Sequence, residues 1–144
     1  MALSDRFSVL NGVKQGGDLS PVLFCLYIDG LAKSKIGCNF GSVYAGALAY
    51  ADDLVLLAPT ASAMRKLLRI CDEYASEYSV VFNANKSACM YSSSKSRSLD
   101  HGCLPLFYVG GHSVDYVTEW VHLGHVISAN CDDKSDIINR RNIL

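Results

Sequence analysis

The sequence has no surplus of positive charge, since 13 lysines and arginines face 14 aspartates and glutamates, giving a formal net charge of −1. Bulk charge therefore gives no indication of nucleic-acid binding, and any basic surface must be local. A disordered chain is also excluded, because 50% of the residues are hydrophobic and only 19% are charged. With 144 residues, the chain is predicted to form one domain with a hydrophobic core.

Long apolar runs are missing as well. Acids or glycines interrupt every apolar segment well short of the ~20 residues that a membrane helix needs. The N-terminus has no basic start followed by a long apolar segment. We therefore expect a soluble, intracellular protein without a membrane partner, in the nucleus or the cytoplasm. The 6 cysteines are scattered and are interpreted as reduced, buried thiols.

A compact zinc-binding pattern is also absent. His122, His125 and Cys131 could supply three ligands, with Cys103 or His112 as the fourth. Their spacing fits no compact zinc pattern, and the two nearest histidines would point to opposite faces of a strand. We therefore regard a zinc site as the weaker interpretation.

What the sequence does contain is hydrophobic periodicity, which predicts an α+β fold with an antiparallel sheet and two helices packed on one of its faces. Helices are expected at 20–32, where Ser20 and Pro21 form a typical helix start, and at 60–78. Strands are expected at 7–10, 43–50, 54–58, 80–82, 88–91 and 120–128, with a further hairpin at 107–117.

Asp52 and Asp53 lie between two apolar runs, which predicts a hairpin with both acids near its tip. At least one of the two side chains must face away from the core, because side chains alternate along an extended chain. Two like charges held so close repel each other unless a cation lies between them, and Mg²⁺ binds one or two carboxylates together with substrate phosphates. The alternative is an ordinary turn with solvent-facing aspartates.

The segment 49–58 resembles the catalytic hairpin of reverse transcriptases, in which an aromatic residue, a small or apolar residue and two aspartates mark the palm. Three further segments resemble motifs of that family in the family's order. They are the Gln-Gly loop and Ser-Pro helix at 11–24, the Asn-x-x-Lys segment at 82–87 and the primer-grip strand at 120–127. Ala51 and the Leu-Ser-Pro run indicate the non-LTR, LINE-like retrotransposon type.

This resemblance implies an RNA-directed DNA polymerase that transfers nucleotides to a primer 3′-hydroxyl with two Mg²⁺ ions. Its partners would be an RNA template, a DNA primer and deoxynucleoside triphosphates. Asp52 would be the firm metal ligand, and Asp53 a second ligand with a more variable role. Lys86 would lie near the triphosphate as a catalytic residue, and its alternative interpretation is a surface lysine.

The resemblance also implies roles for two glycine-containing loops. Gln15, Gly16 and Gly17 would lie near the incoming nucleotide and template base, because glycine lets the backbone approach a ligand closely. Leu123 and Gly124 would support the primer end. The alternative interpretations are an ordinary turn before a helix for the first loop and a plain core strand for the second.

By the same resemblance, 1–128 is a partial palm and 129–144 is the start of a truncated thumb helix. The family's first catalytic aspartate is not matched, since Asp5 lacks the apolar strand that this motif needs. The chain is therefore expected to be inactive by itself, to bind Mg²⁺ weakly and to associate through exposed apolar faces. Two alternatives stay open: a non-catalytic palm-fold remnant or interaction module, and another palm-type nucleotidyltransferase or cyclase.

Overall fold

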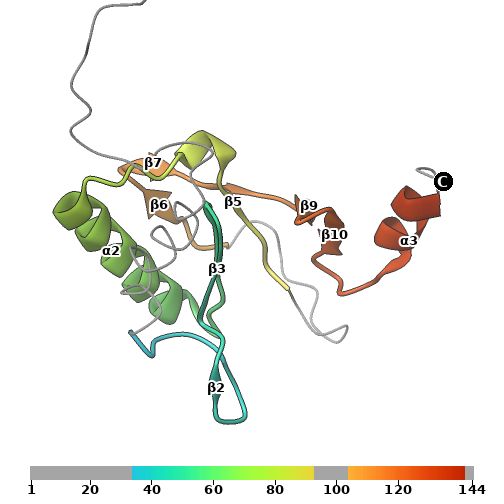
Figure 1. The fold of residues 1–144 in the computed structure, drawn as a ribbon, viewed down its shortest axis with the longest axis horizontal. Coiled ribbons are helices and arrows are strands. Elements are labelled where there is room, and N and C mark those ends of the chain that lie inside the picture. Colours follow the sequence, from blue (N-terminus) through green and yellow to red (C-terminus); the bar gives the residue numbers. More distant parts are fainter. Residues whose placement is uncertain (1–33, 93–103, 142–144) are drawn as a thin grey trace, which may run out of the picture. The chain divides into compact units, whose positions relative to one another are not determined.

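The structure, a computed structural model, describes residues 34–92 and 104–141. The chain divides into two compact units, and the boundary in the sequence falls between Val80 and Val81. The strand expected at 7–10, the helix expected at 20–32 and the loop of Gln15, Gly16 and Gly17 lie outside the described residues. Each unit has its own hairpins and its own helix (Figure 1). None of the described helices combines the length and the apolar character needed to cross a membrane.

The first unit consists of two short hairpins followed by a long helix. Strand β1 (Asn39–Phe40) pairs with β2 (Val43–Tyr44), β3 (Ala47–Tyr50) pairs with β4 (Asp53–Leu56), and α2 (Ala61–Tyr78) follows. Both pairs are antiparallel. The predicted acidic hairpin and the helix predicted at 60–78 are therefore confirmed.

One expected strand of this unit is wrong as a single element. The stretch 43–50 is divided between β2 and β3, because the chain changes its hydrogen-bond partner at Ala45 and Gly46. The N–H of Ala45 donates to the carbonyl oxygen of Cys38 at 2.9 Å, whereas the carbonyl oxygen of Gly46 accepts the N–H of Leu57 at 2.9 Å. The apolar run therefore contributes to two hairpins instead of one long strand.

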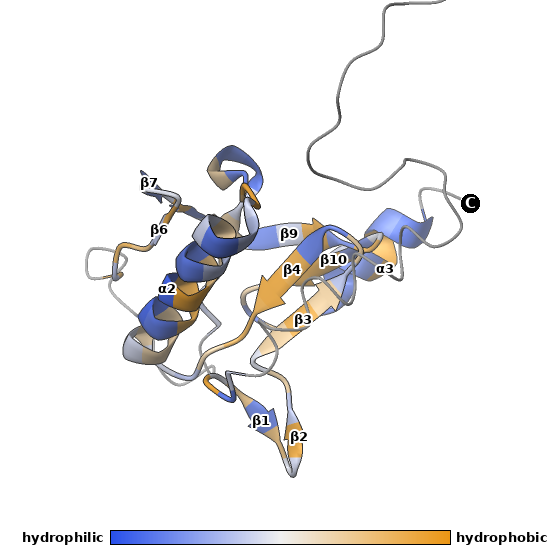
Figure 2. Cartoon of the chain, turned by 60° about the vertical axis from the view of Figure 1, so that its left-hand side comes forward, coloured by the Kyte–Doolittle hydropathy of each residue, from blue (hydrophilic) through white to orange (hydrophobic). Residues whose placement is uncertain are grey.

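Helix α2 presents one apolar face, and its burial follows the sequence spacing. Leu67, Cys71 and Tyr74 are buried, at intervals of four and three residues that place them on one face. The basic and acidic residues of the helix are exposed on its other side, as expected. Figure 2 shows this division of colour along α2, beside the apolar strands β3 and β4 of the same unit. Thr60 is the N-cap of the helix, since its Oγ1 accepts the N–H of Ala63 at 3.2 Å.

The second unit contains mainly short strands and ends in a helix. Its elements are η1 (Ala84–Lys86), β5 (Ala88–Cys89), β6 (Tyr108–Val109), β7 (His112–Ser113), β8 (Asp115–Tyr116), β9 (Glu119–His122), β10 (His125–Ser128) and α3 (Lys134–Arg141). The pairs β6–β7 and β9–β10 are antiparallel, whereas β5 and β8 are parallel. The hairpin expected within 107–117 is confirmed, and Phe107 and Val114 are buried beside it.

Two strands expected in or near this unit are wrong. Residues 80–82 form no strand, because Ser79 ends α2 in a left-handed conformation and the N–H of Val80 donates back to Ala75 at 3.0 Å. The stretch 120–128 is a hairpin instead of one strand, because Leu123 and Gly124 form its turn. The α+β class itself is confirmed by helices combined with short antiparallel strand pairs.

Candidate functional site

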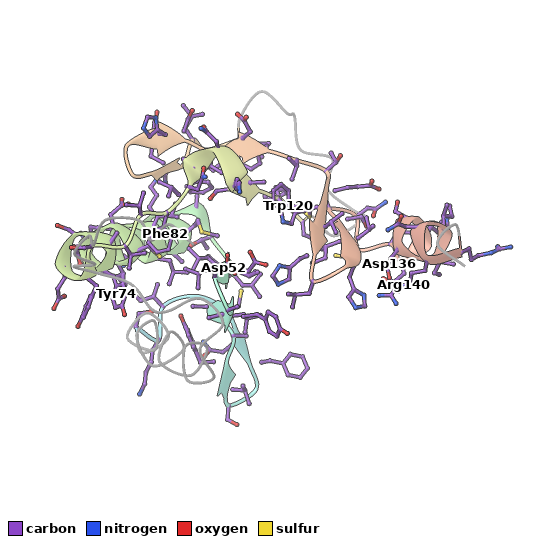
Figure 3. The ribbon with its side chains drawn as sticks, turned by 45° about the horizontal axis from the view of Figure 1, so that its top comes forward. Asp52, Tyr74, Phe82, Trp120, Asp136 and Arg140 are labelled. Carbon is purple, nitrogen blue, oxygen red and sulfur yellow. The ribbon has the colours of Figure 1, made fainter. Side chains whose placement is uncertain are left out.

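The acidic hairpin ends in a turn of two residues. Tyr50 pairs with Asp53, so that Ala51 and Asp52 make the loop between β3 and β4. Ala51 has a φ of 49°, whereas Asp52 is not among the residues with positive φ, a combination typical of a type II′ turn. The turn places Asp52 in the loop and Asp53 at the start of β4, and both are exposed. Figure 3 labels Asp52 at this tip.

The two carboxylates are available to a ligand. Within residues 34–92 and 104–141, neither Asp52 nor Asp53 forms a side-chain hydrogen bond or an ion pair. Carboxylate oxygens are hard donors that suit Mg²⁺, which keeps several of its waters when only one or two carboxylates bind it. No group of three or more histidine, cysteine, aspartate or glutamate side chains gathers in the described part of the chain. The chemistry of these two donors therefore suits a hydrated divalent cation.

The base of this hairpin is fixed by hydrogen bonds beyond its own strand pairs. Leu57 donates its N–H to Gly46 at 2.9 Å, and its carbonyl oxygen accepts the N–H of Cys38 at 2.9 Å. The chain leading into the hairpin and the chain leaving it are thus tied to the same preceding segment. This arrangement gives the acidic tip a braced support.

Lys86 lies in the second unit, at the end of the short helix η1. The N–H of Lys86 and the hydroxyl of Ser87 both donate to the carbonyl oxygen of Asn83, at 3.0 and 2.9 Å. The Asn-x-x-Lys segment is therefore a closed turn, and Lys86 is exposed on it. Among the described residues its ammonium group has no ion-pair partner, so its charge is available to an anion.

Leu123 and Gly124 form the turn of the β9–β10 hairpin. Their φ angles are 50° and 78°, the pattern of a type I′ turn, and Leu123 is 49% exposed. The alternative of a plain core strand is therefore wrong at these two residues. The expectation that His122 and His125 face opposite sides is also wrong, because they are direct cross-strand partners and so share a face.

One side-chain cluster was not anticipated from the sequence. Asp136 and Arg140 on α3 meet the backbone and side chain of β10, where His125 and Val126 lie (Figure 3). The available signal was an aspartate four residues before an arginine in a helix, a spacing that brings the two side chains together. Nothing in that spacing points to β10, because the contact joins residues of different elements.

Comparison with known proteins places these motifs in a family. The reverse transcriptase (RNA-dependent DNA polymerase) family matches residues 2–127, and the chain belongs to this family. Members of the family copy a nucleic-acid template onto a primer from nucleotide substrates, with divalent metal ions. The acidic hairpin, the Asn-x-x-Lys turn and the Leu-Gly turn all fall within the matched residues.

Two curated relatives define the type more closely. The chain is 35% identical to the retrovirus-related Pol polyprotein from type-2 retrotransposable element R2DM of Drosophila melanogaster, over 93% of this chain and 14% of that protein. It is 29% identical to the retrovirus-related Pol polyprotein from type-1 retrotransposable element R2 of Nasonia vitripennis, over 82% of this chain and 12% of that protein. The resemblance to the non-LTR type is thus confirmed, for a chain that spans about one seventh of the first relative.

Proposed function

We propose that this chain supplies the metal-binding palm hairpin of an RNA-directed DNA polymerase of a non-LTR retrotransposon. The observation that carries the proposal is the pair of exposed carboxylates, Asp52 and Asp53, at a two-residue turn within the residues that match the family. Divalent cations bound there would stabilise the charge on the attacking and leaving oxygens of nucleotidyl transfer. Asp52 is the principal ligand in this proposal, and Asp53 is the second.

The remaining motifs have supporting roles in the proposal. Lys86 approaches the triphosphate, where its ammonium group either pairs with negative charge or donates a proton to the leaving pyrophosphate. Leu123 and Gly124 support the primer end from an exposed turn. Gln15, Gly16 and Gly17 contact the incoming nucleotide and template base.

The domain assignment belongs to the same proposal. Residues 1–128 form palm structure, and 129–144, which include α3, begin the thumb. Two carboxylates cannot by themselves hold two ions within about 0.5 Å of productive positions. We therefore expect the 144-residue chain alone not to extend a primer, and a longer protein with a further palm carboxylate and a basic template channel to do so.

The test is primer extension on an RNA template with deoxynucleotides and Mg²⁺, in the longer protein. Asp52→Asn should lower the rate by about 10³-fold or more while primer–template binding stays nearly unchanged, because it removes a metal ligand and not a phosphate contact. Lys86→Ala should cost less, because water replaces a proton donor more easily than a metal ligand. Asp115→Asn, at an exposed aspartate of β8, is the control with the same change in charge.

Full activity of the Asp52→Asn protein would overturn the proposed role of the hairpin. Robust synthesis by the 144-residue chain, sensitive to the same substitution, would instead overturn the expectation that more carboxylates are needed. The two outcomes concern different parts of the proposal and can be told apart in one set of assays.

A second candidate function is a non-catalytic palm-fold module that associates through apolar surface. It is favoured by several large apolar side chains that are exposed within their own units, among them Phe40 at 85%, Val81 at 91% and Leu106 at 63%. Sedimentation of the 144-residue chain tests it: self-association that Phe40→Ser and Leu106→Ser weaken supports the module, and a monomer at all concentrations counts against it.

A further inference from the structure

The hairpin β9–β10 is joined at its open end and near its turn to α3 and to the loop that leads into α3. At the open end of the hairpin, the buried hydroxyl of Ser128 lies 2.7 Å from the carbonyl oxygen of Asp132 and accepts the N–H of Asp132 at 3.1 Å. Beside β9, the hydroxyl of Ser135 donates to Glu119 at 2.5 Å. Near the turn, Asp136 and Arg140 of α3 contact β10. The helix therefore follows the hairpin from its base towards its turn.

Asp136 is the centre of the contact near the turn. Its Oδ1 accepts the backbone N–H of Val126 at 2.9 Å, and its Oδ2 accepts the Nε–H of Arg140 at 2.9 Å. The side chain of Asp136 is only 17% exposed, against 51% for that of Arg140. The Val126 N–H, and to a smaller extent Arg140, hold the pKa of the Asp136 carboxyl below its usual range. The site is therefore built for the ionised carboxylate.

The strand geometry explains why Val126 is the residue that Asp136 contacts. In an antiparallel hairpin, pairs that exchange hydrogen bonds alternate with pairs that do not. The pair His122–His125 closes the two-residue turn, so that the next pair, Val121–Val126, directs its N–H groups away from the partner strand. Asp136 accepts this outward N–H and so satisfies a donor on the outer edge of β10.

Arg140 extends the same contact to the residue beside the turn. Its Nη2 lies 2.7 Å from Nδ1 and 3.0 Å from Nε2 of His125, and because a guanidinium group can only donate, an imidazole nitrogen is the acceptor. His125 directly follows the turn residues Leu123 and Gly124. The two side chains of α3 thus reach both residues that lead out of the turn.

We propose that Asp136 is a positioning residue that fixes the Leu123–Gly124 turn relative to α3. The hairpin and the helix then move as one body, so that the position of the turn relative to α3 stays the same when the helix moves. This inference rests on the proposed function, in which the turn supports the primer end. Its basis is the joint use of both carboxylate oxygens, one for the strand edge and one for the arginine that reaches His125.

The first test needs no polymerase activity and uses the 144-residue chain. Hydrogen exchange of the Val126 amide, followed by NMR, should be about tenfold faster or more in Asp136→Ala, because a hydrogen bond to a charged group is lost. Asp136→Asn keeps an acceptor oxygen and should show a smaller change. Arg141→Ala, next to Arg140 on the same helix, should leave Val126 unchanged. Unaltered exchange in Asp136→Ala would overturn the inference.

The second test uses primer extension by the longer protein. Asp136→Ala should lower the rate of single-nucleotide addition at saturating deoxynucleotide by about ten- to a hundredfold, because a displacement of about 1 Å at the reacting end costs this much. Primer–template affinity should change little, and Asp136→Asn should recover part of the rate. Arg140→Ala keeps the hydrogen bond from Val126 to Asp136, so its rate should lie between those of the unaltered protein and Asp136→Ala. This variant provides the test if Asp136→Ala does not fold.

The outcomes separate this inference from the proposed function. If Asp52→Asn leaves synthesis intact, the proposed function fails, whatever Val126 does. A different result concerns Asp136 alone. If Asp52→Asn abolishes synthesis, but Asp136→Ala and Asp136→Asn are equally impaired and each loses primer affinity as much as rate, Asp136 only stabilises the fold. The positioning role is then refuted.

Discussion

Gly37 and Gly46 cross so closely that a Cβ atom on Gly37 would lie 2.7 Å from the Cα of Gly46 and 2.6 Å from the carbonyl oxygen of Leu57. A Cβ on Gly46 would lie 2.5 Å from the carbonyl oxygen of Ile36 and 2.6 Å from the ring of Tyr44. The Tyr44 hydroxyl donates to the same Ile36 oxygen at 2.7 Å. This crossing lies at the base of the acidic hairpin, where Gly46 accepts the N–H of Leu57.

Gly46→Ala should therefore lower the free energy of unfolding by about 1–3 kcal/mol, because the added methyl group would meet backbone and a held aromatic ring. Denaturant unfolding measures the change. Gly41→Ala is the control, since a Cβ there meets no atom within 4 Å, although φ is +60°. Its strain of about 1 kcal/mol is partly offset by the lower entropy of the unfolded chain. Equal changes in the free energy of unfolding for Gly46→Ala and Gly41→Ala would contradict the close contact between Gly37 and Gly46.

The parts of the fold that were predicted from sequence are those governed by local periodicity. Leu67, Cys71 and Tyr74 are buried because helical spacing places them on one face, and this spacing is visible in the sequence. The hairpin around Asp52 and Asp53 was equally visible, because two apolar runs are separated by a short acidic step. Both signals depend on residues that are close in the chain.

The parts that were missed depend on contacts between distant residues or on unusual backbone. The division of 43–50 follows from the crossing of Gly37 and Gly46, which no local pattern reports. The turn at Leu123 was missed because a leucine rarely adopts a positive φ, so its apolar surroundings favoured a continuous strand. The bond from Val126 to Asp136 joins residues ten positions apart in different elements.

The turn at Leu123 gives a prediction that separates stability from function. Leu123→Asn should stabilise the chain by about 0.5–1 kcal/mol, because Asn-Gly is the preferred type I′ sequence and leucine is strained at a φ of 50°. Little burial is lost, since Leu123 is 49% exposed. Thermal unfolding measures the gain.

If the leucine side chain supports the primer, the same substitution should slow primer extension in the longer protein even though the fold is more stable. A stabilised protein with unchanged extension would mean that the turn contributes only its backbone. Loss of stability would mean that Leu123 does not hold the left-handed conformation.

The thiol of Cys71 gives a prediction for alkaline pH. Burial, with a smaller contribution from the charge of Asp72, raises the pKa of Cys71 from 9.0 to about 11. The unfolded chain therefore ionises this thiol first as the pH rises, so its contribution to stability is complete below pH 9 and is lost towards pH 11. Stability should fall across this range, and the fall should be smaller in Cys71→Ala.

Alkylation gives an independent measurement of the same thiol. At about pH 8, iodoacetamide should modify the exposed Cys131 well before the buried Cys71, because the thiolate is the reactive form. Peptide mass spectrometry locates the label. Equal labelling rates in the folded chain would show that Cys71 is not protected by α2.

Metal binding by the 144-residue chain should be weak, with a dissociation constant roughly in the millimolar range. Among residues 34–92 and 104–141 no cluster of three or more ligating side chains joins Asp52 and Asp53, and Mg²⁺ keeps most of its waters with so few ligands. Mn²⁺ serves as a paramagnetic probe, and the amide signals of 51–54 should broaden first. Asp52→Asn should remove this effect.

The chain contains its own comparison in a second adjacent pair, Asp132 and Asp133. The carboxylate of Asp132 accepts the N–H of Lys134 at 3.0 Å and lies 3.3 Å from its ammonium nitrogen, so this pair already has a cation beside it. A metal ion should therefore prefer Asp52 and Asp53. Equal broadening at both pairs would mean that the acidic hairpin is an ordinary turn without a preference for metal ions. Submicromolar Mg²⁺ affinity that Asp52→Ala abolishes would mean that two carboxylates suffice for a tight site.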